Sequence, residues 1–179
     1  MDLKNIIKTK SLQYGEFTLS SGLLSSYYID LKKTTLDPEG LAVITQTIFN
    51  KILEHCLLNI VDSIGGMDLG ALPIVSALML KSYNKQFSLR GFVIRKSQKN
   101  YGTKNRIEGN LRHADHVILI EDVVTTGKSI LEAVDILQNE HCVIGKIIAV
   151  VDRNQGAREE FVKVGIPYEY IFDIKELLT

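Results

Sequence analysis

The stretch that decides the fold is HVILIEDVVTTGKS, residues 116–129. A run of apolar residues up to Ile120 is typical of a buried strand, and it ends at two acids, Glu121 and Asp122. The turn Thr125–Ser129 then opens a helix. Small and hydroxyl residues in such a turn allow backbone N–H groups and the helix dipole to converge on a phosphate. The stretch therefore predicts a strand, a phosphate-binding turn and a helix in succession.

The acids beside this turn indicate which kind of phosphate compound is bound. Two carboxylates repel a nearby phosphate unless something neutral or cationic lies between them, and ribose hydroxyls or a magnesium ion meet that need. Phosphate and diol together indicate a sugar phosphate. The tripeptide Gly127-Lys128-Ser129 is not a P-loop, because GxxxxGKS requires glycine where this chain has Asp122. The alternative is an ordinary strand-to-helix turn that carries two acids.

Outward from this stretch, short strands and helices alternate along the chain. Such alternation predicts an α/β fold, in which helices cover the faces of a parallel sheet. Two extended segments around Ser20-Ser21-Gly22 predict a hairpin, at residues 16–19 and 27–31. The sheet strands are expected at 60–64, 92–94, 117–120, 143–151 and 168–172, and the helices at 2–10, 37–55, 72–81, 128–139 and 156–164, before a terminal helical turn.

Composition limits the class of protein. A chain of 179 residues predicts one domain, residues 1–179. Basic and acidic residues number 21 each, so no global field favours nucleic acid or an anionic membrane as a partner. Cys56 and Cys142 belong to no metal or disulfide spacing. The N-terminus lacks the apolar core of a signal peptide, and no later stretch is long enough to span a bilayer. We expect a cytoplasmic protein.

A second segment, residues 64–71, also joins a strand to a helix and contains three glycines. Glycines there let backbone amides approach an anion closely. The segment is not a dinucleotide-binding fingerprint, because the middle glycine of GxGxxG falls at Met67. A simple tight turn is an equal alternative.

A third segment, residues 95–109, has no clear periodicity, and loops of this length in compact domains are usually functional or disordered. From Arg90 to Arg106 every formal charge is positive. Such a loop can close over a pyrophosphate leaving group, exclude water and neutralise developing charge. Charge alone favours a solvated loop or a nucleic-acid patch, but beside a phosphate-binding turn the lid interpretation is preferred.

The stretch 116–129 resembles the phosphoribosyl pyrophosphate signature of the type I phosphoribosyltransferases, and the basic loop resembles that of the orotate phosphoribosyltransferases. The resemblance implies that Glu121 and Asp122 hold the ribose hydroxyls and that the following turn holds the 5-phosphate. It implies a pyrophosphate loop at residues 66–70 and catalytic roles for Lys99 and Asp122. The residues implied to bind the donor are Arg95, Lys96, Lys99, Tyr101, Glu121, Asp122, Val123, Val124, Thr125, Thr126, Gly127, Lys128 and Ser129, with Gly66, Met67, Asp68, Leu69 and Gly70 in the pyrophosphate loop.

The base site is implied by the same resemblance. The orotate-binding residues would be Tyr27, Tyr28, Thr125 and Arg153. An arginine fork suits a planar ligand edge that bears oxygens. The alternatives are that one tyrosine ring packs in the core and that Arg153 forms a surface ion pair with Asp152.

The family also implies an architecture and an activity. We expect a type I phosphoribosyltransferase-like parallel sheet flanked by helices, a small N-terminal hood region and a long flexible catalytic loop. The expected reaction is magnesium-dependent conversion of orotate and phosphoribosyl pyrophosphate to orotidine 5-monophosphate, with no firm direct protein ligand for the metal. In the family the loop crosses into the neighbouring subunit, so a homodimer is implied.

The chain departs from the family at several positions. Many members carry cations where this chain has Ser20, Leu23 and Leu24, and the pyrophosphate loop has Asp68-Leu69 in place of a cation. Each missing charged hydrogen bond can weaken binding by roughly 1 to 3 kcal/mol. A different base, or a regulator that binds the donor without catalysis, therefore stays an alternative.

Overall fold

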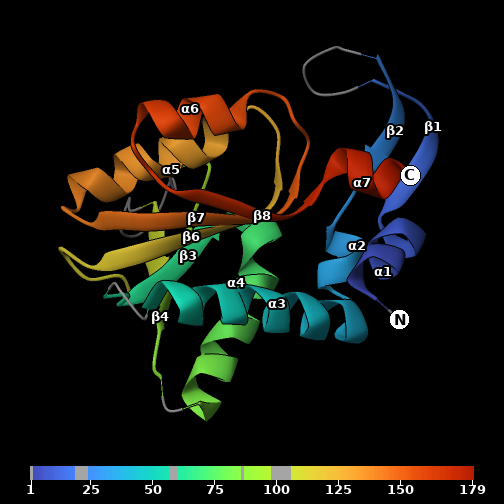
Figure 1. Cartoon of the computed structure of the whole chain (residues 1–179). Helices are drawn as coiled ribbons and strands as arrows, with labels where there is room; N and C mark the ends of the chain where they lie inside the picture. Colours follow the sequence, from blue (N-terminus) through green and yellow to red (C-terminus); the bar gives the residue numbers. More distant parts are fainter. Residues whose placement is uncertain (1, 19–23, 57–59, 86, 98–105) are drawn as a thin grey trace.

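The central strand of the molecule is β6 (His116–Val124), most of whose residues are buried. The computed structural model describes residues 2–18, 24–56, 60–85, 87–97 and 106–179. Six strands form the main sheet in the order β5-β4-β3-β6-β7-β8, and every neighbouring pair is parallel except β4 with β5. The predicted α/β fold with a largely parallel sheet is confirmed (Figure 1).

The chain alternates between strands and helices as predicted. The elements in order are α1 (Leu3–Lys10), β1 (Leu12–Thr18), β2 (Leu24–Ile29), α2 (Lys32–Thr35), α3 (Pro38–Cys56), β3 (Ser63–Met67), α4 (Asp68–Asn84), β4 (Arg90–Ile94), β5 (Ile107–Gly109), β6, α5 (Lys128–Asn139), β7 (Val143–Asp152), α6 (Ala157–Lys163), β8 (Tyr168–Asp173) and α7 (Ile174–Leu178).

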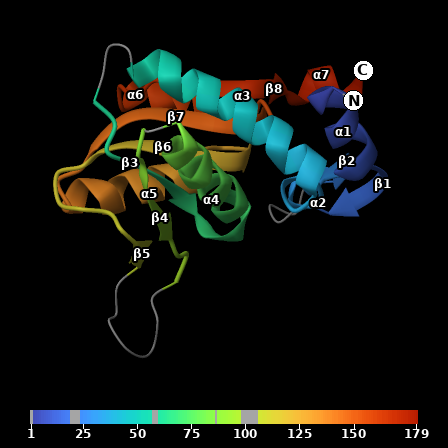
Figure 2. The ribbon, with the colours of Figure 1, turned by 90° about the horizontal axis from the view of Figure 1, so that it is seen from below.

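Two hydrophobic cores lie on opposite faces of the sheet. Ile118 and Ile120 of β6 belong to a core shared with α3 and α4, which cross the same face (Figure 2). Val117 and Leu119 belong to the other core, shared with α5 and α6. Successive side chains of a strand point to opposite faces, so a strand buried on both sides reads as a continuous apolar run. This is why β6 was predictable.

The N-terminal elements α1, β1, β2 and α2 form a small unit, here called the hood. It lies beside α7 at the end of the sheet toward which the parallel strands point (Figure 1). Ile7 of α1, Leu31 and Leu177 of α7 are buried in the same core as α3 and α4. The hood is thereby fixed over the edge of the sheet where ligands bind in open α/β folds.

The largest departure from the predicted elements is at β3. We expected a strand at 60–64 and a helix from Leu72, but β3 is Ser63–Met67 and α4 begins at Asp68. A Cβ atom on Gly66 would collide with the carbonyl oxygen of Ile120 on the neighbouring strand. Glycine there permits close packing of two strands, so it belongs inside a strand and not in a turn.

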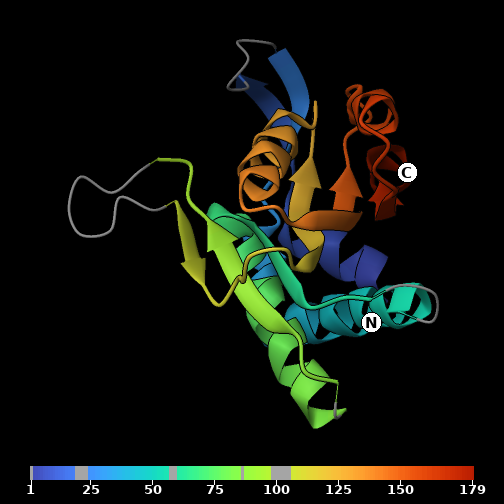
Figure 3. The same ribbon diagram turned by 90° about the vertical axis from the view of Figure 1, so that its left-hand side faces the viewer.

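The other departures are smaller. The strand β6 continues through the acids to Val124, because its backbone pairs with β7 as far as Asp152. The hairpin strands are Leu12–Thr18 and Leu24–Ile29, both starting earlier than predicted. The short helix α2 and the edge strand β5 were not predicted. Figure 3 shows β4 and β5 side by side at the edge of the sheet.

An ion pair between a buried carboxylate and a partly exposed arginine joins the ends of β7 and β8 to α6. The carboxylate of Asp152 is fully buried and accepts a hydrogen bond from Arg158 Nε at 2.8 Å. Arg158 Nη2 donates to Asp173 Oδ2 at 2.8 Å, and the guanidinium lies 4.3 Å from the centroid of the Tyr170 ring. We call Asp152, Arg158 and Asp173 the clamp. It holds the segment that follows β7.

Replacing Arg158 by Ala should reduce the free energy of unfolding by about 3 kcal/mol, because the Asp152 carboxylate is then left buried without its cation. Urea unfolding at neutral pH measures the loss. The matched control is Lys163→Ala on the same helix, whose pair with Glu160 is exposed and should contribute less than about 0.5 kcal/mol. Equal losses of unfolding free energy in the two variants would contradict a stabilising role of the clamp.

Candidate active site

A cavity of about 510 Å³ lies where β3 and β6 end. Its walls come from the start of α4, the end of β6, the start of α5, the hood and the segment after β4. Strand ends are where open parallel sheets bind ligands. The lining residues are Lys32, Met67, Asp68, Leu69, Gly70, Lys96, Glu121, Asp122, Val123 and Ser129.

The acid pair of the signature lies at this cavity. Glu121 is only 7 % exposed, and Asp122 is half-buried. Burial, and to a lesser degree the neighbouring Asp122 carboxyl, raises the pKa of Glu121 well above its usual range. The backbone N–H groups of Asp122 and Val123 donate to the Glu121 and Asp122 side chains at 3.2 and 2.8 Å. The two carboxyl groups therefore have fixed positions beside the cavity.

The start of α4 approaches these acids closely. A Cβ atom on Gly70 would lie 2.6 Å from Asp122 Oδ1. Any residue other than glycine would therefore displace the Asp122 carboxylate. Asp68 has a φ of 53°, an uncommon left-handed backbone for a residue other than glycine. Residues 66–70, expected to be a loop, are thus the end of β3 and the first residues of α4.

Asp68 also joins this segment to the one after β4. Its Oδ1 accepts a hydrogen bond from the Lys96 backbone N–H at 3.2 Å, and its Oδ2 lies 3.6 Å from Lys96 Nζ. Arg95 Nη1 lies 3.8 Å from Glu108 Oε1 in an ion pair. The backbone N–H of Arg95 donates a hydrogen bond to the carbonyl oxygen of Arg106. Two of the basic residues predicted to bind the donor, Arg95 and Lys96, are therefore positioned beside the start of α4.

The predicted phosphate-binding turn begins α5. The helix starts after Gly127 and has no side-chain cap, so its first N–H groups are available to an anion. Ser129 lines the cavity at the acid pair, whereas Thr126 and Lys128 line a neighbouring cavity of about 380 Å³. Val124 is buried in the core, and its carbonyl oxygen accepts the Arg153 N–H.

The hood and the end of β7 meet at the predicted base site. The Arg153 guanidinium lies 5.2 Å from the centroid of the Tyr27 ring, and Arg153 Nε is buried without a hydrogen-bond partner among the described residues. Tyr27 is partly buried against the core, whereas Tyr28 is 41 % exposed and its ring lies 5.5 Å from Phe17. The Tyr27 ring thus packs inward, in agreement with the alternative that one of the two tyrosine rings belongs to the core.

The other alternative at this site was wrong. We considered an ion pair between Asp152 and Arg153, but the structure pairs Asp152 with Arg158. Arg153 immediately follows the clamp, so its backbone position is fixed while its side chain lies against the hood. This arrangement leaves the guanidinium available to a planar ligand.

One cavity residue, Lys32, was missed from the sequence. It lies on α2, a helix of four residues that is too short to show a period. The only signal was the pair Lys32-Lys33 after Asp30. Two predicted donor-binding residues, Lys99 and Tyr101, lie outside the described residues.

Within the described ranges, no group of three or more His, Cys, Asp or Glu side chains could hold a metal ion. Cys56 and Cys142 are both free. Among the helices that the structure describes, none has the length and apolar character needed to cross a membrane.

Comparison with known proteins identifies the family. The family model named phosphoribosyl transferase domain matches residues 41–170. The orotate phosphoribosyltransferase of Aquifex aeolicus is 41 % identical over 179 residues, covering 98 % of this chain and 96 % of that protein. The enzyme of the same name from Methanocaldococcus jannaschii is 36 % identical over 176 residues, covering 98 % of this chain and 94 % of that protein.

A solved structure from the same family has a similar fold. The crystal structure of the Mycobacterium tuberculosis orotate phosphoribosyltransferase in complex with phosphoribosyl pyrophosphate superimposes with a TM-score of 0.78. It is 29 % identical, and the match covers 99 % of this chain and 97 % of that one. From its fold, its signature and these matches, the chain belongs to the orotate phosphoribosyltransferase family.

Proposed function

We propose that this chain transfers ribose 5-phosphate from phosphoribosyl pyrophosphate to orotate, giving orotidine 5-monophosphate and pyrophosphate in pyrimidine synthesis. The observation that carries the proposal is the meeting of three features at one edge of the sheet. These are the acid pair Glu121-Asp122, the uncapped start of α5 and the Arg153–Tyr27 contact. The enzyme works as one domain, residues 1–179, in the cytoplasm.

The donor is held along this edge. Glu121 and Asp122 bind the ribose hydroxyls, and the backbone and hydroxyl groups of Thr125–Ser129 bind the 5-phosphate. Val123 and Val124 set the spacing between these two sites. The pyrophosphate lies between residues 66–70 and the basic loop, which contributes Arg95, Lys96, Lys99 and Tyr101.

The reaction is a displacement at the anomeric carbon. The bond from that carbon to the pyrophosphate oxygen breaks while a bond to the orotate nitrogen forms, through a sugar with cationic character. Asp122 faces the ribose and stabilises this positive charge, and Lys99 stabilises the negative charge of the departing pyrophosphate. Orotate lies against Tyr27 and Tyr28 near Thr125, where the Arg153 fork binds oxygens on its edge.

Magnesium bound together with the donor would neutralise charge on the pyrophosphate. The half-buried Asp122 carboxylate is a hard oxygen ligand that suits this ion. Magnesium keeps several waters and is usually held by one or two carboxylates together with substrate phosphates.

The enzyme works as a homodimer in which the basic loop reaches the neighbouring subunit. Support comes from an apolar groove of about 620 Å³ beside Arg95 and Lys96, between α4 and β4. Leu69 in this groove is 71 % exposed, and Leu72 is also exposed. Exposed apolar side chains of this kind are typical of surfaces that a partner covers.

Lys99→Ala should lower kcat by at least about tenfold with a smaller change in donor affinity, because the charge on the leaving group develops only in the transition state. The ultraviolet absorbance of orotate measures turnover, with magnesium and donor present. The matched control is Lys104→Ala, which removes the same charge from the same loop and should keep turnover.

Equal losses in these two variants would assign the effect to loop charge and exclude a specific role for Lys99. Absence of turnover in the unsubstituted protein, with calorimetric binding of the donor retained, would instead indicate a regulator without transferase activity.

Arg153→Ala should raise the KM for orotate about 10- to 100-fold, because a charged hydrogen bond to the base is lost. The KM for the donor should change little. Arg153→Lys keeps the charge but not the fork and should recover only part of the affinity. If orotate KM is unchanged while another base is used equally well, the base assignment is wrong.

Glu121→Gln should stabilise the ligand-free protein at neutral pH while weakening donor binding. Since the pKa of Glu121 is raised in the folded state, the unfolded chain loses this proton near the ordinary value of 4.5 whereas the folded chain retains it. Folding stability therefore falls as pH rises above that value. Glutamine removes this penalty, so the gain in unfolding free energy should grow from pH 4 to pH 8. Urea unfolding that shows a pH-independent difference would contradict this assignment.

A further inference from the structure

We propose that Lys32, on the hood helix α2, binds the pyrophosphate group of the donor. The inference rests on the proposed function and adds a residue that comes from outside the signature and the basic loop. Lys32 lines the same cavity as the acid pair and as Met67–Gly70. It is the hood's contribution to a cavity whose other walls come from the sheet and from α4 and α5.

The position of the Lys32 ammonium group is fixed by Asp30. Asp30 Oδ1 accepts a hydrogen bond from the Lys32 backbone N–H at 3.2 Å, and the same oxygen lies 2.7 Å from Lys32 Nζ. The hydrogen bond that the Lys32 ammonium donates to Asp30 is the main cause that raises the pKa of Lys32, and the charges of Asp30 and Asp122 add to it. Lys32 is therefore a charged donor at the wall of the cavity at every pH near neutrality.

The charges around the cavity explain why this cation is needed. Lys96 is engaged by Asp68, both through its backbone and through its ammonium group. The segment 66–70 has no cationic side chain, and the exposed side chain of Leu69 cannot donate a hydrogen bond, so this segment offers a phosphate only its backbone N–H groups. Asp122 adds negative charge to the same space. A pyrophosphate entering here requires more positive charge than Lys96 alone offers, and Lys32, itself held by Asp30, adds a second cation.

The pyrophosphate is favoured over the 5-phosphate as the group that Lys32 contacts. The turn predicted to bind the 5-phosphate begins α5, and two of its residues, Thr126 and Lys128, line a separate cavity. Lys32 instead shares its cavity with all of Met67–Gly70 at the start of α4 and with one residue of that turn, Ser129. A cation in that place is therefore nearer to the segment proposed to hold the leaving group than to most of the 5-phosphate turn.

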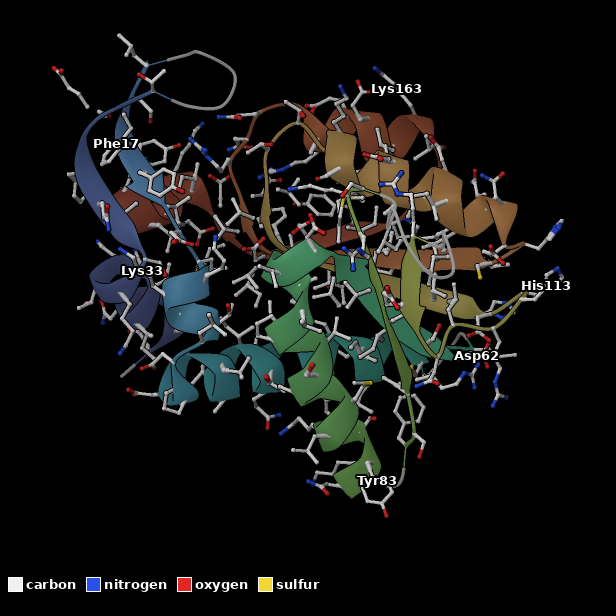
Figure 4. The ribbon with its side chains drawn as sticks, turned by 180° about the vertical axis from the view of Figure 1, so that it is seen from behind. Phe17, Lys33, Asp62, Tyr83, His113 and Lys163 are labelled. Atoms are coloured by element: carbon white, nitrogen blue, oxygen red, sulfur yellow. The ribbon has the colours of Figure 1, made fainter. Side chains whose placement is uncertain are left out.

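The neighbouring Lys33 provides the matched control. It lies on the same four-residue helix, is exposed and is not among the residues that line the cavity. Figure 4 shows Lys33 at the hood end of the molecule, on the side of Phe17 and away from Asp62 and His113 at the far end of the sheet. Removing it takes away the same charge from the same helix without changing the cavity.

Isothermal calorimetry with magnesium pyrophosphate and, separately, ribose 5-phosphate tests the proposal on the full chain. Lys32→Ala should weaken pyrophosphate binding by about tenfold or more, whereas ribose 5-phosphate binding should change by less than about twofold. Lys32→Arg keeps a cation and should recover most of the pyrophosphate affinity. Lys33→Ala should bind both ligands as the unsubstituted protein does. Thermal unfolding of each variant confirms that it is folded.

Two results would overturn the proposal. The first is pyrophosphate binding by Lys32→Ala equal to that of Lys33→Ala. The second is a parallel loss of ribose 5-phosphate binding, which would mean that Lys32 only supports the structure of the cavity.

The orotate assay separates this inference from the proposed function. Turnover by the unsubstituted protein with unchanged pyrophosphate binding in Lys32→Ala rejects only the role of Lys32. Selective loss of pyrophosphate binding without turnover on orotate supports Lys32 and rejects the assignment of the base.

Discussion

The site depends on the close approach of β3 to β6, which Gly66 permits. A side chain at that position would strike the Ile120 carbonyl oxygen and the side chain of Ala71. Since the two strands are parallel and end at the same edge, their close packing brings the start of α4 next to Glu121 and Asp122. Gly70 completes the arrangement by leaving room for the Asp122 carboxylate. Two glycines from one segment thus determine the position of two acids from another.

This arrangement has an energetic cost. A carboxyl group that is removed from water favours its neutral form, and Glu121 lies next to a second carboxyl group. In the proposed donor complex, ribose hydroxyls would donate hydrogen bonds to this pair without adding charge and would offset part of the cost. Active sites often retain groups that destabilise the ligand-free fold, because the same groups bind the ligand.

The sequence predicted the features that depend on local patterns. The apolar run of β6 and the turn at Thr125–Ser129 identified the strand, the helix and the acid pair between them, since each follows from neighbours in the chain. The bounds of β3 were wrong because glycines usually mark turns, and only the packing against Ile120 shows why Gly66 lies in a strand. The role proposed for Lys32 depends on the position of the hood against the sheet, and no local sequence pattern encodes that position.

The partner of Asp152 shows the same limit and connects the base site to the rest of the fold. Arg153 is adjacent in sequence, but the end of β7 directs the buried carboxylate toward α6, where Arg158 meets it. Arg158 also binds Asp173, whose side chain caps α7. Because α7 packs in the same core as the hood, the clamp links both sides of the Arg153–Tyr27 contact. The proposed base site is therefore assembled by the docking of the hood against the sheet, and its geometry depends on the packing of α7 as much as on Arg153 and Tyr27 themselves.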